Sequence, residues 1–203
     1  MMFFQDTRSI GLVFWIVVAL LLFDSGITFL CFFTDDMSSV PLYVSDPRLY
    51  CLLMAVGSLV TAAVYGLNAH RVMSKTLTRL KVISSYVTTV GICTLINGIV
   101  EGLALFMYTE DLPFGMMVTA ATIVIGLIII MTGLVLADGK KGLLKKIICA
   151  VLVISFVLMA ADSLTEAANY SQYAVHIAHL LISVFMLMFI TDREVRIEMG
   201  AVS

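Results

Sequence analysis

Four carboxylates stand inside long apolar stretches of the chain, an unusual place for an ionisable group: Asp24, Glu101, Asp162 and Glu166. No Lys or Arg lies within the same stretches to pair with them. Charged side chains in hydrocarbon are costly, so they usually face the interior of a helix bundle or a wet cavity. Either some of these groups are protonated at neutral pH, or a cation lies among them. Both readings point to cation or proton handling, and they weigh as much as a structural role for the deeper Asp24 and Asp162. For Glu101 and Glu166, simple contact with headgroup water is the preferred interpretation.

The last two carboxylates are followed by two histidines. Asp162 and Glu166 precede a turn near Ser171, and His176 and His179 come after it. Counting from the turn places Glu166 opposite His176 and Asp162 opposite His179. These four side chains could hold a divalent metal ion such as Zn²⁺, Mn²⁺ or Fe²⁺, or relay protons. A structural cluster of His–carboxylate hydrogen bonds ranks ahead of both readings.

Similar polar pairs recur along the chain. In three places a basic residue is followed by a polar residue sixteen positions later and by a second polar residue four positions beyond it. The three series are Arg8, Asp24 and Thr28; Lys81, Asn97 and Glu101; and Lys146, Asp162 and Glu166. A spacing of four places both polar members on one face of a helix. We therefore expect three helical hairpins in a parallel, three-fold internal repeat.

The elements that must position these residues are six apolar stretches. They cover about 9–33, 49–69, 82–107, 114–137, 147–169 and 173–191, and a membrane-spanning helix needs about 20 such residues. Of the 203 residues, 61% are hydrophobic and 13% charged, and the mean hydropathy is +1.08. Soluble domains carry about 25% charged residues. These values exclude disorder, a disulfide scaffold and a soluble enzyme, and predict an all-α integral membrane protein with residues 1–203 as one polytopic domain.

The basic residues predict the orientation. Eleven of the twelve fall at the two termini and in the loops after the second and fourth spans, and the exception is Arg48. Lys and Arg are held on the cytoplasmic side of membranes. We therefore expect both termini in the cytoplasm and the protein in the cell's inner (plasma) membrane. The first apolar stretch is too long for a cleaved signal peptide and contains Asp24, so we interpret it as a span.

The preferred functional hypothesis is movement of a small cation, proton or small solute through an outward-facing polar pocket. Its lining would be Asp24, Asn97, Glu101, Asp162, Glu166, His176 and His179. One alternative is a non-catalytic accessory or stress-associated membrane protein whose polar residues hold helices together. Another is a membrane-embedded redox or metal-dependent enzyme, although the chain has no recognised nucleophile, zinc-protease or phosphate-binding motif.

The expected partners are the lipid bilayer and either a second copy or another membrane subunit. The net charge of −2 gives no basic excess for nucleic acid. Two smaller features concern packing. Gly98 and Gly102 predict a close helix contact, and Cys31 and Cys51 flank the first outer loop, where they could form a disulfide.

Overall fold

The structure is a computed structural model, and it describes residues 6–33, 44–75, 77–108, 112–138, 142–166 and 173–201. The side chains of residues 31, 165, 166 and 173–175 lie outside this description. Within the described residues the chain is helical, and the one extended contact is an isolated bridge between Val44 and Tyr108. The all-helical prediction is therefore confirmed for this part of the chain.

Each expected span contains one long helix. In chain order these are α2 (Thr7–Phe33), α3 (Pro47–Ser74), α4 (Arg79–Ala104), α5 (Leu112–Ala137), α6 (Leu143–Glu166) and α7 (Tyr173–Thr191). A 3₁₀ turn, η1 (Leu105–Met107), follows α4, and a short helix, α8 (Arg193–Glu198), follows α7. The first five long helices are long and apolar enough to cross a membrane. The part of α7 whose side chains are described, His176–Thr191, is also apolar but covers fewer residues. A multi-pass membrane protein is thus supported, and the sixth crossing remains a prediction.

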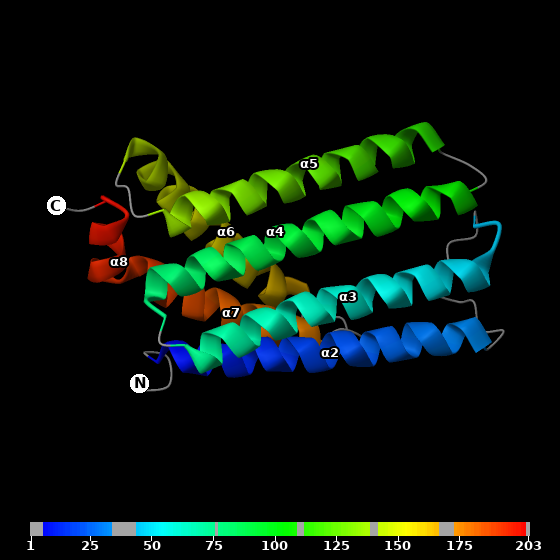
Figure 1. Cartoon of the computed structure of the whole chain (residues 1–203), viewed down its shortest axis with the longest axis horizontal. Coiled ribbons are helices and arrows are strands. Elements are labelled where there is room, and N and C mark those ends of the chain that lie inside the picture. Colours follow the sequence, from blue (N-terminus) through cyan, green and yellow to red (C-terminus); the bar gives the residue numbers. More distant parts are fainter. Residues whose placement is uncertain are drawn as a thin grey trace.

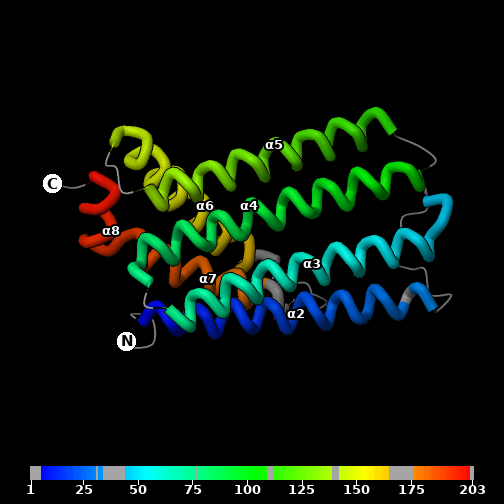
Figure 2. Tube along the Cα trace, viewed as in Figure 1, coloured from blue at the N-terminus to red at the C-terminus, as the bar shows by residue number. Residues whose placement is uncertain are grey.

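Consecutive helices pair with each other. The most extensive contacts join α2 to α3, α4 to α5, and α6 to α7. Helices α2 to α5 lie side by side in chain order as a layer, and α6 and α7 lie behind it (Figure 1). The trace shows that the start of α2 and helix α8 lie at the same end of the bundle (Figure 2). We call this the near end and the opposite one the far end. The pairing fits the expected hairpins, whereas the internal repeat remains a prediction.

The hydrophobic core occupies the half of the bundle beside the near end. Phe14, Ile83 and Phe185 are among its largest fully buried side chains, and each lies in the near half of its helix. The Phe14 ring of α2 stacks on Tyr86 of α4 with centroids 5.6 Å apart, and Tyr86 lies 6.2 Å from the Phe156 ring of α6. These three rings, the aromatic cluster, join one helix from each pair.

The pair α4–α5 is built on glycines that let the two backbones approach. A methyl group added to Gly91 would lie 2.6 Å from the Ile130 nitrogen, and one on Gly126 would lie 2.8 Å from the Leu95 nitrogen. The expected contact at Gly98 is confirmed, because a Cβ there would lie 2.9 Å from Ile123. Small residues at such contacts are a usual device for packing membrane helices.

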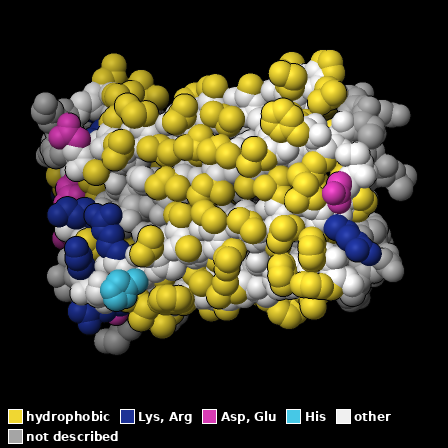
Figure 3. All heavy atoms as spheres, turned by 45° about the vertical axis from the view of Figure 1, so that its right-hand side comes forward, with side chains coloured by type: hydrophobic (Ala, Val, Ile, Leu, Met, Phe, Trp, Pro, Cys, Tyr) yellow, Lys and Arg dark blue, Asp and Glu magenta, His cyan; other side chains and the backbone are white. Residues whose placement is uncertain are grey.

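The charged residues gather at the two ends, and an apolar surface covers the middle (Figure 3). At the near end, Arg79 forms an ion pair with Asp192, which also caps α8. Lys145 donates to the carbonyl oxygens of Leu136 and Asp138, and so satisfies the C-terminal end of α5. The near end therefore has the basic character that the sequence predicts for the cytoplasmic side.

Candidate functional site

Asp24 of α2 and Asn97 of α4 lie on the same face of their helices as the side chains that pack into the core. Asp24 follows the buried Val17 by seven residues, and Asn97 follows Val90, which packs against the core, by the same interval. Seven residues are about two helical turns, so the members of each pair lie on one face. In the near half that face packs into the core, whereas further along the helix Asp24 and Asn97 are both exposed. The far half of the bundle therefore presents polar groups beyond the aromatic cluster.

Asp24 lies well inside its helix. It stands seventeen residues after Thr7 and nine before Phe33. Ser58 of α3 donates to its carboxylate over 3.5 Å, a long hydrogen bond, and the Asp24 side chain is otherwise exposed. A carboxylate at such a depth is expensive in hydrocarbon and is usually reached by water. Its position therefore favours access of water to this part of α2.

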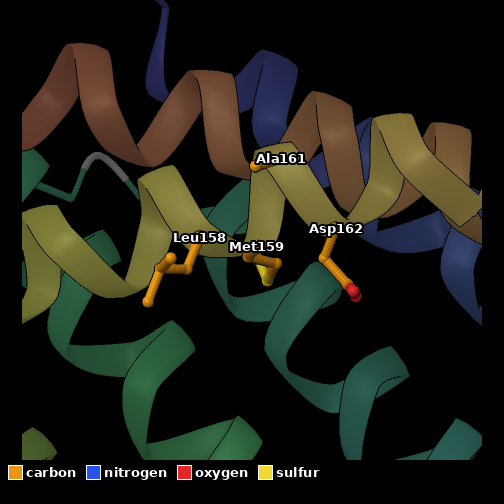
Figure 4. Close-up of a pocket in the computed structure, with 4 residues that line it drawn as sticks. All are labelled: Leu158, Met159, Ala161 and Asp162. Atoms are coloured by element: carbon orange, nitrogen blue, oxygen red, sulfur yellow. The ribbon is translucent and has the colours of Figure 1, made fainter.

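Asp162 lines an open cavity on α6. The cavity has a volume of about 570 Å³ and is lined by Leu158, Met159, Ala161 and Asp162. The Asp162 side chain points away from α7 (Figure 4). The Tyr86 hydroxyl of α4 contacts the Met159 sulfur at 3.8 Å. This cavity therefore borders the aromatic cluster, and we call it the Asp162 cavity.

Glu101 lies in a different cavity, of about 390 Å³. Its described lining comes from α3, α4 and η1, the segment after η1, and α5: Tyr50, Met54, Glu101, Leu105, Tyr108, Phe114, Gly115, Val118 and Thr119. A half-buried carboxylate beside aromatic rings can attract a cation, and no Lys or Arg is present in this described lining. The expected alternative for Glu101, simple contact with headgroup water, is compatible with its place near the far end.

The histidine–carboxylate cluster is described in part. His176 is buried and His179 is half-buried. Asp162 and His176 are the charged or titratable neighbours that act electrostatically on His179. The Asp162 side chain nevertheless points away from α7 (Figure 4), and the Glu166 side chain lies outside the described residues, so the expected opposition of the two carboxylates and the two histidines stays a prediction. Among the described side chains, no group of three or more His, Cys, Asp or Glu residues is arranged to hold a metal ion.

The expected pocket residues are therefore distributed over several places. Asp162 lines its own cavity on α6, Asp24 lies beside Ser58, Glu101 lies in a second cavity, and Asn97 is exposed. The expected disulfide cannot be followed here, because Cys51 is buried and the Cys31 side chain is outside the described part.

Sequence reasoning missed the aromatic partners of the site, above all Tyr86. A tyrosine within an apolar span was the available signal, since a buried hydroxyl normally finds a partner. Its contact with Met159 joins residues 73 positions apart, and no local spacing predicts such a contact.

Comparisons with protein-family models, with curated proteins and with solved structures gave no match to this chain.

Proposed function

We propose that this protein resides in the plasma membrane, crosses it six times, and moves a small cation or protons through a water-filled vestibule beside Asp24, Asn97 and Asp162. In this proposal both termini are cytoplasmic and the far end faces outward. Asp24 and Asp162 attract the cation, Asn97 supplies a neutral polar ligand, and His179 exchanges protons with Asp162 through the water of the vestibule. Glu101, Glu166 and His176 line the mouth.

One observation carries the proposal. Asp24 and Asn97 lie on the core-facing sides of α2 and α4, just beyond the last residues that pack into the core. Asp162 lines an open cavity next to the aromatic cluster. Residues that served only to hold helices together would be expected inside a tight contact. Exposed carboxylates far inside spanning helices instead favour a path for ions or protons.

Cation flux into proteoliposomes tests the proposal. The purified protein is reconstituted, and uptake of protons, Na⁺ and K⁺ is followed in turn under an imposed membrane potential. We expect Asp162→Asn to lower the flux of the transported ion by about tenfold, equivalent to about 1.4 kcal/mol. Asp24→Asn and His179→Ala should lower it as well.

Glu194→Gln is the matched control, because Glu194 is exposed on α8 at the near end. It removes one carboxylate charge, as Asp162→Asn does, and should leave the flux unchanged. Equal flux in the wild type, Asp162→Asn and Asp24→Asn would overturn the proposal.

A second candidate is the accessory membrane protein, and the hydrogen bond from Ser58 to Asp24 favours it. Here the carboxylate would join α2 to α3 and carry no ion. Asp24→Asn and Ser58→Ala would then lower thermal stability in detergent, while reconstituted protein would show no flux of any of the three ions.

A further inference from the structure

The cavity that contains Glu101, which we call the Glu101 cavity, lies where three helices meet at the far end. Helix α3 begins there, α4 ends there in η1, and α5 begins there (Figure 1). Glu101 lies three residues before the end of α4, while Tyr50 and Gly115 lie in the first turns of α3 and α5. The cavity volume of about 390 Å³ falls within the range of about 300–1,000 Å³ that is usual for small-molecule sites.

Close contacts and hydrogen bonds fix the walls of this cavity. A Cβ added to Gly102 would lie 3.1 Å from the Thr119 side chain, so α4 and α5 pack closely beside the carboxylate. The Ser45 backbone nitrogen and hydroxyl both donate to the Met107 carbonyl, over 2.7 and 2.8 Å. These bonds join the residues before α3 to the turn that follows α4, directly before Tyr108 of the lining. The walls are therefore formed before any ligand binds, as is usual for small-molecule sites.

The described lining combines one carboxylate with aromatic rings. Glu101 supplies the formal negative charge, and the rings are those of Tyr50, Tyr108 and Phe114. The faces of aromatic rings attract cations, and the recognition of quaternary ammonium ions is the best-known use of this attraction. A hard metal ion such as Ca²⁺ would instead need a shell of oxygen ligands, whereas Met54 and the rings offer sulfur and apolar carbon. The lining therefore suits a monovalent cation that carries carbon substituents.

We propose that the Glu101 cavity binds a small quaternary ammonium ion. The charged nitrogen lies beside the Glu101 carboxylate, and the carbon substituents pack against the aromatic rings. A primary ammonium ion suits the lining less well, because each of its three N–H groups needs an acceptor. This site is separate from the vestibule of the proposed function, so it does not depend on the movement of an ion through that vestibule.

The quaternary ammonium group can come from two sources. The cavity lies at the ends of the spanning helices, where the polar headgroups of a bilayer begin. Both a soluble ion such as choline and the headgroup of a choline phospholipid carry the same group, and the experiments below distinguish them.

Calorimetric titration of choline tests the site. The purified full chain is titrated in an uncharged maltoside detergent with choline and with its neutral isostere, a dimethylbutanol in which carbon replaces the charged nitrogen. We expect choline to bind at least about tenfold more tightly than the isostere, because only the cation is attracted by the carboxylate and the rings. Equal binding of the two compounds, or no binding of choline, would overturn the proposal.

Glu101→Gln tests the carboxylate. It keeps the shape of the side chain and removes the charge, so choline binding should weaken by about tenfold. Glu194→Gln on α8, at the near end, is the matched control for the loss of one charge and should bind choline as the wild type does. Unchanged binding in Glu101→Gln would also overturn the proposal.

Tyr108→Leu tests the rings. It should weaken choline binding by about tenfold, whereas Tyr108→Phe keeps a ring and should bind choline nearly as well as the wild type. Phe106→Leu is the matched control, because Phe106 is 88% exposed and is absent from the described lining. If Tyr108→Phe weakened binding as much as Tyr108→Leu does, recognition by the rings would be wrong.

Two lipid compositions distinguish the sources of the ammonium group. The protein is placed in nanodiscs of phosphatidylglycerol, which has no ammonium group, or of phosphatidylcholine, and choline binding is measured in each. Equal binding in both assigns the site to a soluble ion. Binding only in phosphatidylglycerol assigns it to the choline headgroups of the bilayer, which then occupy the site.

The outcomes also separate this site from the proposed function. If choline does not bind while cation flux depends on Asp162, the ammonium site is overturned and the proposed function stands. If choline binding depends on Glu101 while flux is independent of Asp162, the proposed function fails and the ammonium site stands.

Discussion

At the scale of single residues, two serines join the helices of a pair through their side chains. Ser25 of α2 donates to the Ala55 carbonyl of α3, and Ser84 of α4 donates to the Gly133 carbonyl of α5, both at 2.8 Å. These carbonyls already serve their own helices, so the serine bonds use their second lone pair. Interhelical hydrogen bonds of this kind contribute modestly in membranes.

We expect Ser84→Ala to lower the free energy of unfolding by about 0.6–1.5 kcal/mol, because the bond to α5 is lost in a buried site. Thr132→Val is the control, since the half-buried Thr132 donates an exposed hydrogen bond to the Ile128 carbonyl of its own helix and joins no second helix. The free energy of unfolding of both variants is measured by titration with SDS in a mild detergent. If Thr132→Val lowered this free energy as much as Ser84→Ala does, this account of the serine bonds would be wrong.

At this scale spacing alone could predict which polar residues lie deep within their helices, but not that Asp24, Glu101 and Asp162 lie in separate places. The sixteen-residue interval from Arg8 to Asp24 recurs as Lys81 to Asn97 and Lys146 to Asp162, and it gave the depth of each group. Spacing could not predict that Tyr86 would join Phe14 to Phe156, because each of those contacts depends on how separate pairs of helices are placed. Nor could spacing predict that Asn68 of α3 would accept a hydrogen bond from Ser85 of α4, because that bond depends on how two helix pairs meet.

At the scale of helices, the α4–α5 pair shows how closely its backbones pack. Small residues recur every seven positions on both helices, at Ser84, Gly91 and Gly98 and at Thr119, Gly126 and Gly133. All six are buried. The sequence analysis used only Gly98 and Gly102, because a seven-residue interval becomes meaningful once the partner helix is known. The helices themselves could be predicted from apolar length, and all six form.

Gly126→Ala should destabilise the protein by about 1–3 kcal/mol, because the new methyl group would press on the α4 backbone at Leu95 and force the helices apart. Gly26→Ala is the matched control in α2, where nothing lies within 4 Å of the added atom. There the loss of glycine's backbone freedom should stabilise the helix by about 0.5–1 kcal/mol. Thermal unfolding in detergent would compare the two, and a stabilised Gly126→Ala would rule out the close contact.

At the scale of the whole molecule, three helix pairs meet at one aromatic cluster, and the core fills only the near half. Helix α7 lies against α2, α4 and α6, and its buried side chains, including Ile182, Met186 and Phe189, belong to that core. The part of α7 whose side chains are described, His176–Thr191, is apolar. Its burial against three helices places α7 inside the bundle.

The number of crossings decides the orientation of the chain, and it can be measured. With six crossings the two termini lie on the same side of the membrane, which agrees with the start of α2 and helix α8 lying together at the near end (Figure 2). Five crossings would place the termini on opposite sides. Because the basic residues gather at the near end, we expect green fluorescent protein fused after Ser203 to fluoresce when the chain is made in a bacterial inner membrane. Alkaline phosphatase fused at the same point should be inactive, and phosphatase placed in the loop between α4 and α5 should be active. An active phosphatase after Ser203 would show that α7 does not cross the membrane. The six-crossing arrangement that the proposed function assumes for Asp162 and His179 would then be wrong.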